Sequence, residues 1–116
     1  MIDLFCSDTK LNLSAYYFRP SIGYGGSCLP KDLGALQKIS KLAGTNSILL
    51  DSVSKSNLFQ IKRTFNIIRK EAEKRNEKTL SIYGISFKPG SDDIRGSPII
   101  YIFEKLKSLD FDMKLY

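Results

Sequence analysis

The sequence predicts a mainly helical domain with one long helix, followed by the first strand-helix-strand unit of a doubly wound α/β domain. Four patterns lead to this fold class. Apolar residues recur at helical spacing from about 46 to 75, which is a long stretch in a chain of 116 residues. A strand pattern, a helix start at Ser97-Pro98 and a second strand pattern follow. We therefore expect a helical domain over 1–76 and a truncated α/β domain over 77–116.

The first 26 residues combine a short helical end with an irregular segment. Residues 1–8 have the pattern of a helix end, on which Cys6 packs with other apolar side chains. The irregular segment 9–26 contains the run Tyr16-Tyr17-Phe18-Arg19-Pro20. Aromatic rings beside an arginine can hold a nucleotide or a sugar phosphate by stacking and ion pairing. The same rings can also anchor a loop on a core, and these residues alone leave both interpretations open.

A glycine-rich turn precedes the next helix. The run Gly25-Gly26-Ser27-Cys28-Leu29-Pro30-Lys31-Asp32 places one cysteine at the helix start, because proline fits the first helical turn. Apolar residues at helical spacing then continue the helix over about 31–43, and Gly44 is a typical stop signal. Two adjacent glycines allow backbone conformations that other residues avoid, and they let a ligand approach closely.

Cys28 has two interpretations at this position. A helix N-terminus contributes only roughly 0.3–1 kcal/mol, too little to ionise a thiol whose ordinary pKa is about 8.5. A reactive Cys28 therefore needs a further cation, which Lys31 or a positively charged cofactor would supply. The alternative is that Cys28 is a small buried apolar residue, as free cysteines often are.

The predicted helix over 46–75 carries two apolar stripes. They comprise Leu50, Leu58, Ile61, Phe65 and Ile68 in one stripe, and Leu49, Val53, Phe59 and Ile67 in the other. A helix with two apolar stripes needs contacts on two sides, so we expect it to form a homodimer with a second subunit. The alternative is a break near 54–57 that folds the helix back on itself.

The last part of the chain reads as a parallel α/β unit. Strand patterns at 79–87 and 111–116 flank the helix, so the strands are expected to be parallel with a right-handed crossover. Ligands of such sheets bind beyond the carboxyl ends of the strands, where Lys88 and Arg95 lie. Both side chains can bind phosphate, or they can simply be solvated on a surface turn. The loop matches neither a Walker A motif nor a GxGxxG fingerprint.

Composition excludes several classes of function. The chain has no histidine, so Ser/His and Cys/His nucleophilic arrangements cannot form within it. Cys6 and Cys28 match no zinc motif, and we expect no metal. A net charge of +6 suggests an anionic partner, although the basic long helix fits a solvated face better than a nucleic-acid patch. No signal peptide or membrane-spanning apolar run is evident, so we expect a cytoplasmic protein without a membrane partner.

Two motifs together resemble a known family. GGSCLPKD, followed by GISFKPGSDDIRGSP beyond the long helix, is similar to the signature pair of the nucleotide-sugar dehydrogenases, which oxidise UDP-glucose or GDP-mannose to the uronic acid. The preceding CSDTKLNLSAYYFRP is most similar to the GDP-mannose branch of that family. The resemblance covers essentially the whole chain but only a middle portion of the family's length.

This resemblance implies an NAD-dependent oxidation in two hydride transfers, through a thiohemiacetal and a thioester on the nucleophile Cys28. Asp32 matches the carboxylate that assists water or proton transfer. The cofactor-binding positions are Lys31 and Arg95. The positions that hold the nucleotide sugar are Tyr16, Tyr17, Arg19, Ile22, Gly25 and Lys88, with Arg19 reaching into the partner subunit's site. Ile22 replaces an expected aromatic, and Gly96 stands where a glutamate is common.

The resemblance also accounts for the long helix and the truncated sheet. In the family, the long helix links two Rossmann-like domains and builds the dimer, and the sheet begins the nucleotide-sugar domain. We expect the amino-terminal NAD-binding domain to be absent from this chain, and we expect the chain alone to be inactive. Two other classes remain open: a non-catalytic module for nucleotide binding or dimerisation, and a basic nucleic-acid binder.

Overall fold

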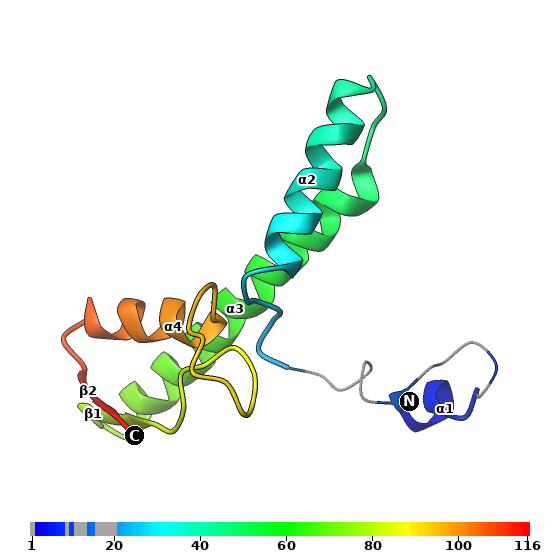
Figure 1. Ribbon diagram of the computed structural model, residues 1–116. Helices are drawn as coiled ribbons and strands as arrows, with labels where there is room; N and C mark the ends of the chain where they lie inside the picture. Colours follow the sequence, from blue (N-terminus) through cyan, green and yellow to red (C-terminus); the bar gives the residue numbers. More distant parts are fainter. Residues whose placement is uncertain (1, 9, 11–13, 16–20) are drawn as a thin grey trace.

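The computed structural model describes residues 2–8, 10, 14–15 and 21–116. Its helices and strands confirm the predicted fold class, a helical part followed by a parallel strand-helix-strand unit (Figure 1). In chain order they are α1 (Ile2–Cys6), α2 (Leu29–Leu42), α3 (Ile48–Lys74), β1 (Thr79–Ile82), α4 (Pro98–Lys107) and β2 (Asp112–Leu115). Helix α1 contacts none of the other described helices or strands.

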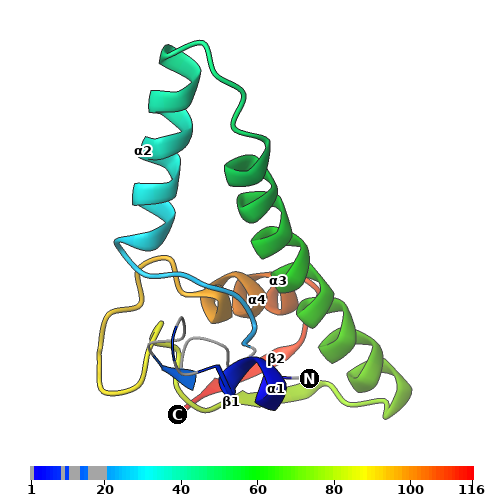
Figure 2. The same ribbon diagram turned by 90° about the vertical axis from the view of Figure 1, so that its right-hand side faces the viewer.

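Helices α2 and α3 form an antiparallel hairpin that extends away from the sheet (Figures 1 and 2). Helix α2 begins at Leu29, two residues before the predicted start, because Pro30 already occupies its first turn. The helix ends where Gly44 adopts a φ of +67°, which a glycine reaches at little cost. The backbone N–H of Gly44 then donates to the carbonyl of Lys41 at 3.2 Å, which satisfies an end carbonyl of the helix.

Helix α3 is a single continuous helix of 27 residues. At 1.5 Å per residue it is about 40 Å long. The alternative of a break near 54–57 is therefore wrong. The Gln37 side chain of α2 ties the two helices together, because its Nε2 lies 3.0 Å from Oδ1 of Asp51 and 3.1 Å from Oγ of Ser54. The same nitrogen also donates to the carbonyl of Leu50 at 3.2 Å.

The hydrophobic core lies at the other end of α3, where α4 packs against it (Figure 2). Its buried members are Ile61, Ala72, Ile102, Leu106 and Phe111. Strands β1 and β2 are parallel over four residue pairs, from Thr79 opposite Asp112 to Ile82 opposite Leu115. This register confirms the predicted parallel pair.

Strand β1 is shorter than the predicted strand 79–87. It ends at Ile82, and Gly84 then turns the chain with a φ of +77°. The backbone N–H of Gly84 donates to the carbonyl of Tyr116 at 2.9 Å, which closes the ladder at its carboxyl end. The apolar side chain of Phe87, which suggested a longer strand, instead packs against the turn that precedes α2.

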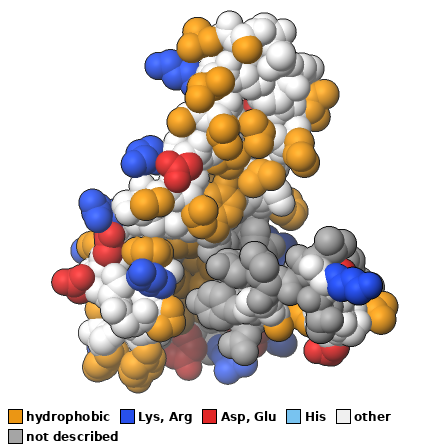
Figure 3. Space-filling model, turned by 45° about the vertical axis from the view of Figure 1, so that its right-hand side comes forward, with side chains coloured by type: hydrophobic (Ala, Val, Ile, Leu, Met, Phe, Trp, Pro, Cys, Tyr) orange, Lys and Arg blue, Asp and Glu red, His pale blue; other side chains and the backbone are white. Residues whose placement is uncertain are grey.

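Much of the apolar surface of the hairpin is exposed. Helix α2 has no buried residue, and α3 buries only Ile61 and Ala72. Figure 3 shows hydrophobic side chains gathered along the part of the molecule where the hairpin extends. The most exposed of them are Leu29, Leu36, Ile39 and Leu42 on α2, and Ile48, Leu49, Phe59 and Ile67 on α3. No described helix combines the length and the hydropathy needed to cross a membrane.

Candidate functional site

Cys28 lies at the N-cap of α2 with its side chain exposed to solvent. Its carbonyl accepts the first helical hydrogen bond, from the backbone N–H of Asp32 at 2.9 Å. The Ser27 hydroxyl lies 3.7 Å from the Cys28 sulfur, within the range of a weak hydrogen bond. The predicted helix-start position of the cysteine is confirmed, and its exposure removes the alternative of a buried, packed thiol.

The cysteine turn packs directly against the loop between β1 and α4. A Cβ added at Gly26, whose φ is +87°, would lie 2.8 Å from the ring of Phe87. A Cβ added at Gly25 would collide with the carbonyl oxygen of Gly96 and would lie 2.8 Å from Cδ of Pro98. Because side chains would not fit, the glycines let the two backbones touch. The two motifs singled out in the sequence thus meet in space.

Arg95 is held in this loop by Asp93. Its Nε donates to Oδ1 of Asp93 at 2.9 Å and its Nη2 donates to Oδ2 at 2.8 Å, which is a bidentate ion pair. The backbone N–H of Arg95 donates to the same Oδ1 at 2.9 Å. These hydrogen bonds lower the pKa of the Asp93 carboxyl from 3.8 to about 2.

Arg95 also interacts electrostatically with Cys28. The Asp93 carboxylate is the main cause that raises the pKa of Arg95, and the negative charge of a Cys28 thiolate adds to this effect. The Arg95 side chain is 74% exposed, so one side of the guanidinium faces solvent rather than the core. The loop therefore presents an accessible cation within electrostatic range of the thiol, and this cation comes from the second part of the chain.

Lys88 lies in the same loop. Its Nζ is 5.4 Å from the centroid of the Phe87 ring, and its charge contributes to the lowered pKa of Asp93. Hydrogen bonds within the loop fix its path, one from the Ser86 hydroxyl to the carbonyl of Lys88 at 3.0 Å and one from the Asp93 N–H to the Ser91 hydroxyl at 3.1 Å. Lys88 and Arg95 consequently both interact electrostatically with the Asp93 carboxylate.

The remaining predicted site residues are only partly located. Lys31 and Asp32 are exposed on the first turn of α2, directly after Cys28. Ile22 is half-buried and packs against the hydrophobic core. Tyr16, Tyr17 and Arg19 lie outside the described residues. Their roles, like those of the other predicted site residues, stay predictions.

Asp32 also borders an apolar groove between α2 and α3. The groove has a volume of about 370 Å³ and is lined by Tyr24, Leu29, Asp32, Leu33, Leu36 and Val53. Its position places an apolar surface next to Leu29, the residue that follows Cys28.

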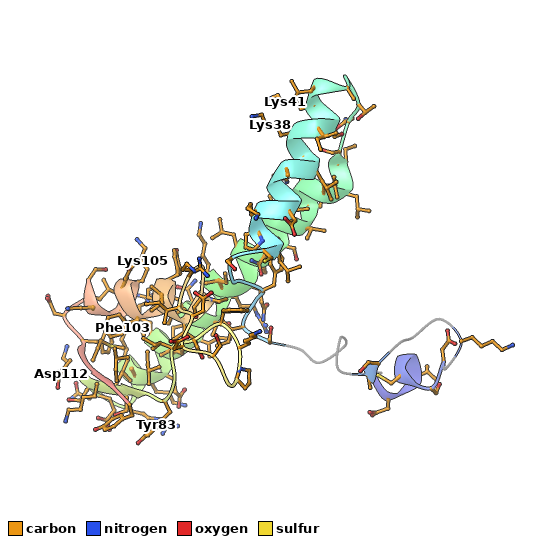
Figure 4. All side chains as sticks on the ribbon, in the orientation of Figure 1. Lys38, Lys41, Tyr83, Phe103, Lys105 and Asp112 are labelled. Carbon is orange, nitrogen blue, oxygen red and sulfur yellow. The ribbon has the colours of Figure 1, made fainter. Side chains whose placement is uncertain are left out.

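Figure 4 shows that the basic residues Lys38 and Lys41 lie toward the free end of the hairpin, whereas Tyr83 and Asp112 lie by the sheet.

Sequence reasoning missed the residue that holds the cysteine turn on α3. The side-chain Oδ1 of Asn57 accepts the backbone N–H of Tyr24 at 2.8 Å, and Nδ2 of Asn57 donates to the carbonyl of Tyr24 at 3.0 Å. The two residues are 33 positions apart, so no local pattern indicated the contact. Asp93 was missed as well. In a loop, an aspartate whose carboxylate can accept the backbone N–H two residues later is a familiar Asx-turn signal.

The fold and the site define a segment in which a helical part presents an exposed thiol to a cation-bearing loop of an α/β unit. The chain belongs to the UDP-glucose/GDP-mannose dehydrogenase family. Residues 1–58 match the central domain of this family, and residues 81–116 match its UDP binding domain.

Individual relatives have the same two parts. The GDP-mannose 6-dehydrogenase of Pseudomonas putida is 38% identical over all 116 residues, which make up 26% of that protein. The UDP-glucose 6-dehydrogenase YwqF of Bacillus subtilis is 36% identical over 104 residues, which cover 90% of this chain and 24% of the relative. The chain thus spans about a quarter of the length of the curated relatives it matches.

Solved structures share the fold. A ternary complex of GDP-mannose dehydrogenase from Pseudomonas aeruginosa superimposes with a TM-score of 0.81 at 36% identity, covering 98% of this chain and 25% of that one. A UDP-glucose dehydrogenase from Pyrobaculum islandicum gives a TM-score of 0.84 at 21% identity, over 98% of this chain and 26% of that one. The second likeness is one of fold alone.

Proposed function

We propose that the chain is part of an NAD-dependent nucleotide-sugar 6-dehydrogenase that oxidises GDP-mannose to GDP-mannuronate. The observation that carries the proposal is the contact between the cysteine turn and the loop that bears Arg95 and Lys88. It joins the cysteine turn to a loop that carries two cations, from two parts of the chain that are far apart in sequence. The boundary between the proposed domains, 1–76 and 77–116, lies in the short connection between α3 and β1.

The chemistry proposed for Cys28 follows from its exposure at a helix N-terminus. Its thiolate attacks the aldehyde carbon of the half-oxidised sugar, a C–S bond forms, and the carbonyl oxygen takes up a proton to give a thiohemiacetal. Loss of hydride from the same carbon and of the hydroxyl proton leaves a thioester. Attack by water then breaks the C–S bond, which releases the carboxylate and returns the Cys28 thiolate. Asp32, four residues after Cys28 on the exposed first turn, is proposed to accept a proton from that water.

The proposed cofactor is NAD, which would accept the hydride in each oxidation. The residues present fit such a dinucleotide, because Lys31 and the solvent-facing side of Arg95 offer cations to its diphosphate. Lys88 is proposed to bind the nucleotide sugar, together with Tyr16, Tyr17, Arg19, Ile22 and Gly25. An NAD-binding domain would have to be supplied by a longer chain, so we expect the 116 residues alone to be inactive.

We also propose a homodimer through α3. The face of α3 turned away from the core carries the exposed side chains of Leu49, Val53, Phe59 and Ile67. Ser52 and Ser56 lie between them and line a surface hollow of about 540 Å³ beside the cysteine turn. Small residues flanked by large apolar ones let two helices approach closely, and a second copy would remove this surface from water. The proposed location of the dimer is the cytoplasm.

The second candidate substrate is a UDP-sugar such as UDP-glucose. It is favoured by the match of residues 81–116 to a UDP binding domain. GDP-mannose is preferred because the GDP-mannose 6-dehydrogenase of Pseudomonas putida aligns over the whole chain, whereas YwqF aligns over 90% of it. The candidate of another class is a module that binds a nucleotide sugar without oxidising it.

The test uses a longer chain that includes an NAD-binding domain. We expect NADH and a uronic acid to form from GDP-mannose, with slower turnover of UDP-glucose. Cys28→Ser should abolish uronate formation, whereas the matched variant Cys6→Ser should retain it. Unchanged turnover in Cys28→Ser would reject the thioester chemistry, and binding of GDP-mannose without any NADH would favour the non-catalytic module.

A further inference from the structure

We propose that Asn57 is a positioning residue for Cys28, an inference that rests on the function proposed above. Asn57 lies on α3, and its half-buried carboxamide bonds both backbone groups of Tyr24, with distances of 2.8 and 3.0 Å. This is the pair of hydrogen bonds that a neighbouring β-strand would make. Tyr24 lies four residues before Cys28 in a segment without helix or strand, so Asn57 takes the place of secondary structure there.

The segment before the cysteine lies directly on α3. A Cβ added at Gly23 would be 2.8 Å from Oδ1 of Asn57 and 2.9 Å from Cγ1 of Ile61. The backbone therefore approaches the helix as closely as a glycine permits, and the Asn57 bonds fix its register along the helix. A sliding motion of this segment would break both hydrogen bonds at once.

The residues that follow Tyr24 make a second set of contacts. Gly25 and Gly26 touch the carbonyl of Gly96 and the ring of Phe87 in the loop that bears Arg95. The cysteine turn and the residues before it therefore contact both α3 and this loop. Because α3 is one continuous helix, Asn57 attaches the turn at a fixed place on it. This attachment sets the position of Cys28 relative to Arg95.

The chemistry of the amide explains why this position suits asparagine. It supplies one acceptor and one donor on a short side chain, which match the N–H and C=O of Tyr24. An apolar residue of similar size would leave both half-buried backbone groups without a partner. A misplacement of about 1 Å at a reacting group can cost a factor of about 10² in rate, so a loosened turn should act on turnover rather than on binding.

A first experiment tests positioning without any catalysis. In the 116-residue chain, with Cys6→Ser in the background, the alkylation rate of Cys28 by iodoacetamide is measured for wild type, Asn57→Leu and Gln37→Leu. Gln37 is the matched control, because its amide also binds groups of α3, nearer the free end of the hairpin, and does not contact the cysteine turn. We expect Asn57→Leu to move the Cys28 rate toward that of the chain in guanidinium chloride, and Gln37→Leu to leave it unchanged.

A second experiment separates positioning from mere stability. In the longer chain, Asn57→Leu should lower kcat by about 10- to 100-fold with little change in KM for the nucleotide sugar. Asn57→Asp, which keeps an acceptor for the Tyr24 N–H, should retain more of kcat. Unchanged kcat in Asn57→Leu, or equal alkylation effects in the Asn57 and Gln37 variants, would overturn the proposal. Failure of the wild type to form uronate would instead reject the proposed function, and the alkylation result would still decide the role of Asn57.

Discussion

Asp93 binds Arg95 through three hydrogen bonds, two from the guanidinium and one from the backbone N–H, all between 2.8 and 2.9 Å. The carboxylate thereby fixes both the side chain and the main chain of Arg95. Gly96, the next residue, touches the backbone of Gly26 in the cysteine turn. One aspartate thus orients the cation and supports the contact between the two motifs.

This ion pair gives a pH prediction. The pKa of Asp93 is lowered to about 2 from 3.8 in the folded chain, so the folded state favours the ionised carboxylate. The stabilisation is present above about pH 4 and is lost as the pH falls toward 2. We expect an NMR titration of the Asp93 carboxyl to show a midpoint well below 3.8, and Arg95→Gln to move it back toward that value. Identical midpoints in the two proteins would mean that the pair does not form in solution.

A second prediction concerns the close approach at Gly25. Gly25→Ala places a methyl group against the carbonyl of Gly96, so it should lower the free energy of unfolding by about 1–3 kcal/mol. Gly34→Ala is the matched control, because Gly34 lies within α2 and has no neighbour within 4 Å. It should raise the free energy of unfolding by roughly 0.5–1 kcal/mol. Denaturant unfolding measures both, and equal effects would contradict the packed turn.

The third prediction concerns self-association through α3. Phe59 is 68% exposed on the face of this helix that also carries the exposed side chains of Leu49, Val53 and Ile67. Phe59→Glu should convert a dimer into a monomer in sedimentation, because a charge would be buried in the interface. Leu109→Glu also introduces a charge at an exposed leucine, but away from α3, and should leave the dimer intact. A wild-type monomer at high concentration would remove the proposed interface.

The fourth prediction compares the two thiols. Cys28 is exposed at the start of α2 and interacts electrostatically with Arg95, whereas Cys6 is half-buried on the short helix α1. Iodoacetamide should therefore modify Cys28 faster than Cys6 in the folded chain, as mass spectrometry of the tryptic peptides can measure. In guanidinium chloride the two rates should converge. Equal rates in the folded chain would count strongly against an activated Cys28.

The elements of the fold could be predicted because their signals are local. Helical spacing and end signals such as Pro30 and Gly44 indicated α2, and the long apolar pattern indicated α3. The error came at 79–87, where alternating apolar residues matched a strand. Gly84 breaks that strand, and Phe87 is apolar because it packs on the cysteine turn.

The site could be predicted only motif by motif. The cysteine turn and the loop of Arg95 were each evident, since their residue types suit reactive or anion-binding chemistry. Their contact depends on how the glycines of the two motifs pack in the folded chain. The spacing of residues along the sequence does not indicate that packing. The bond between Asn57 and Tyr24 left no signal either, because an asparagine on a helix is ordinarily solvated.

The absence of buried residues in α2 has a consequence for dynamics. Local opening costs least where few apolar contacts are lost, so amide hydrogens of α2 should exchange with solvent much sooner than those of α4, where Ile102 and Leu106 are 1% exposed. The helix that carries Cys28 at its start thus has less tertiary protection than α3 or α4 in the chain on its own. Whatever covers α2 would also determine how firmly the thiol is held.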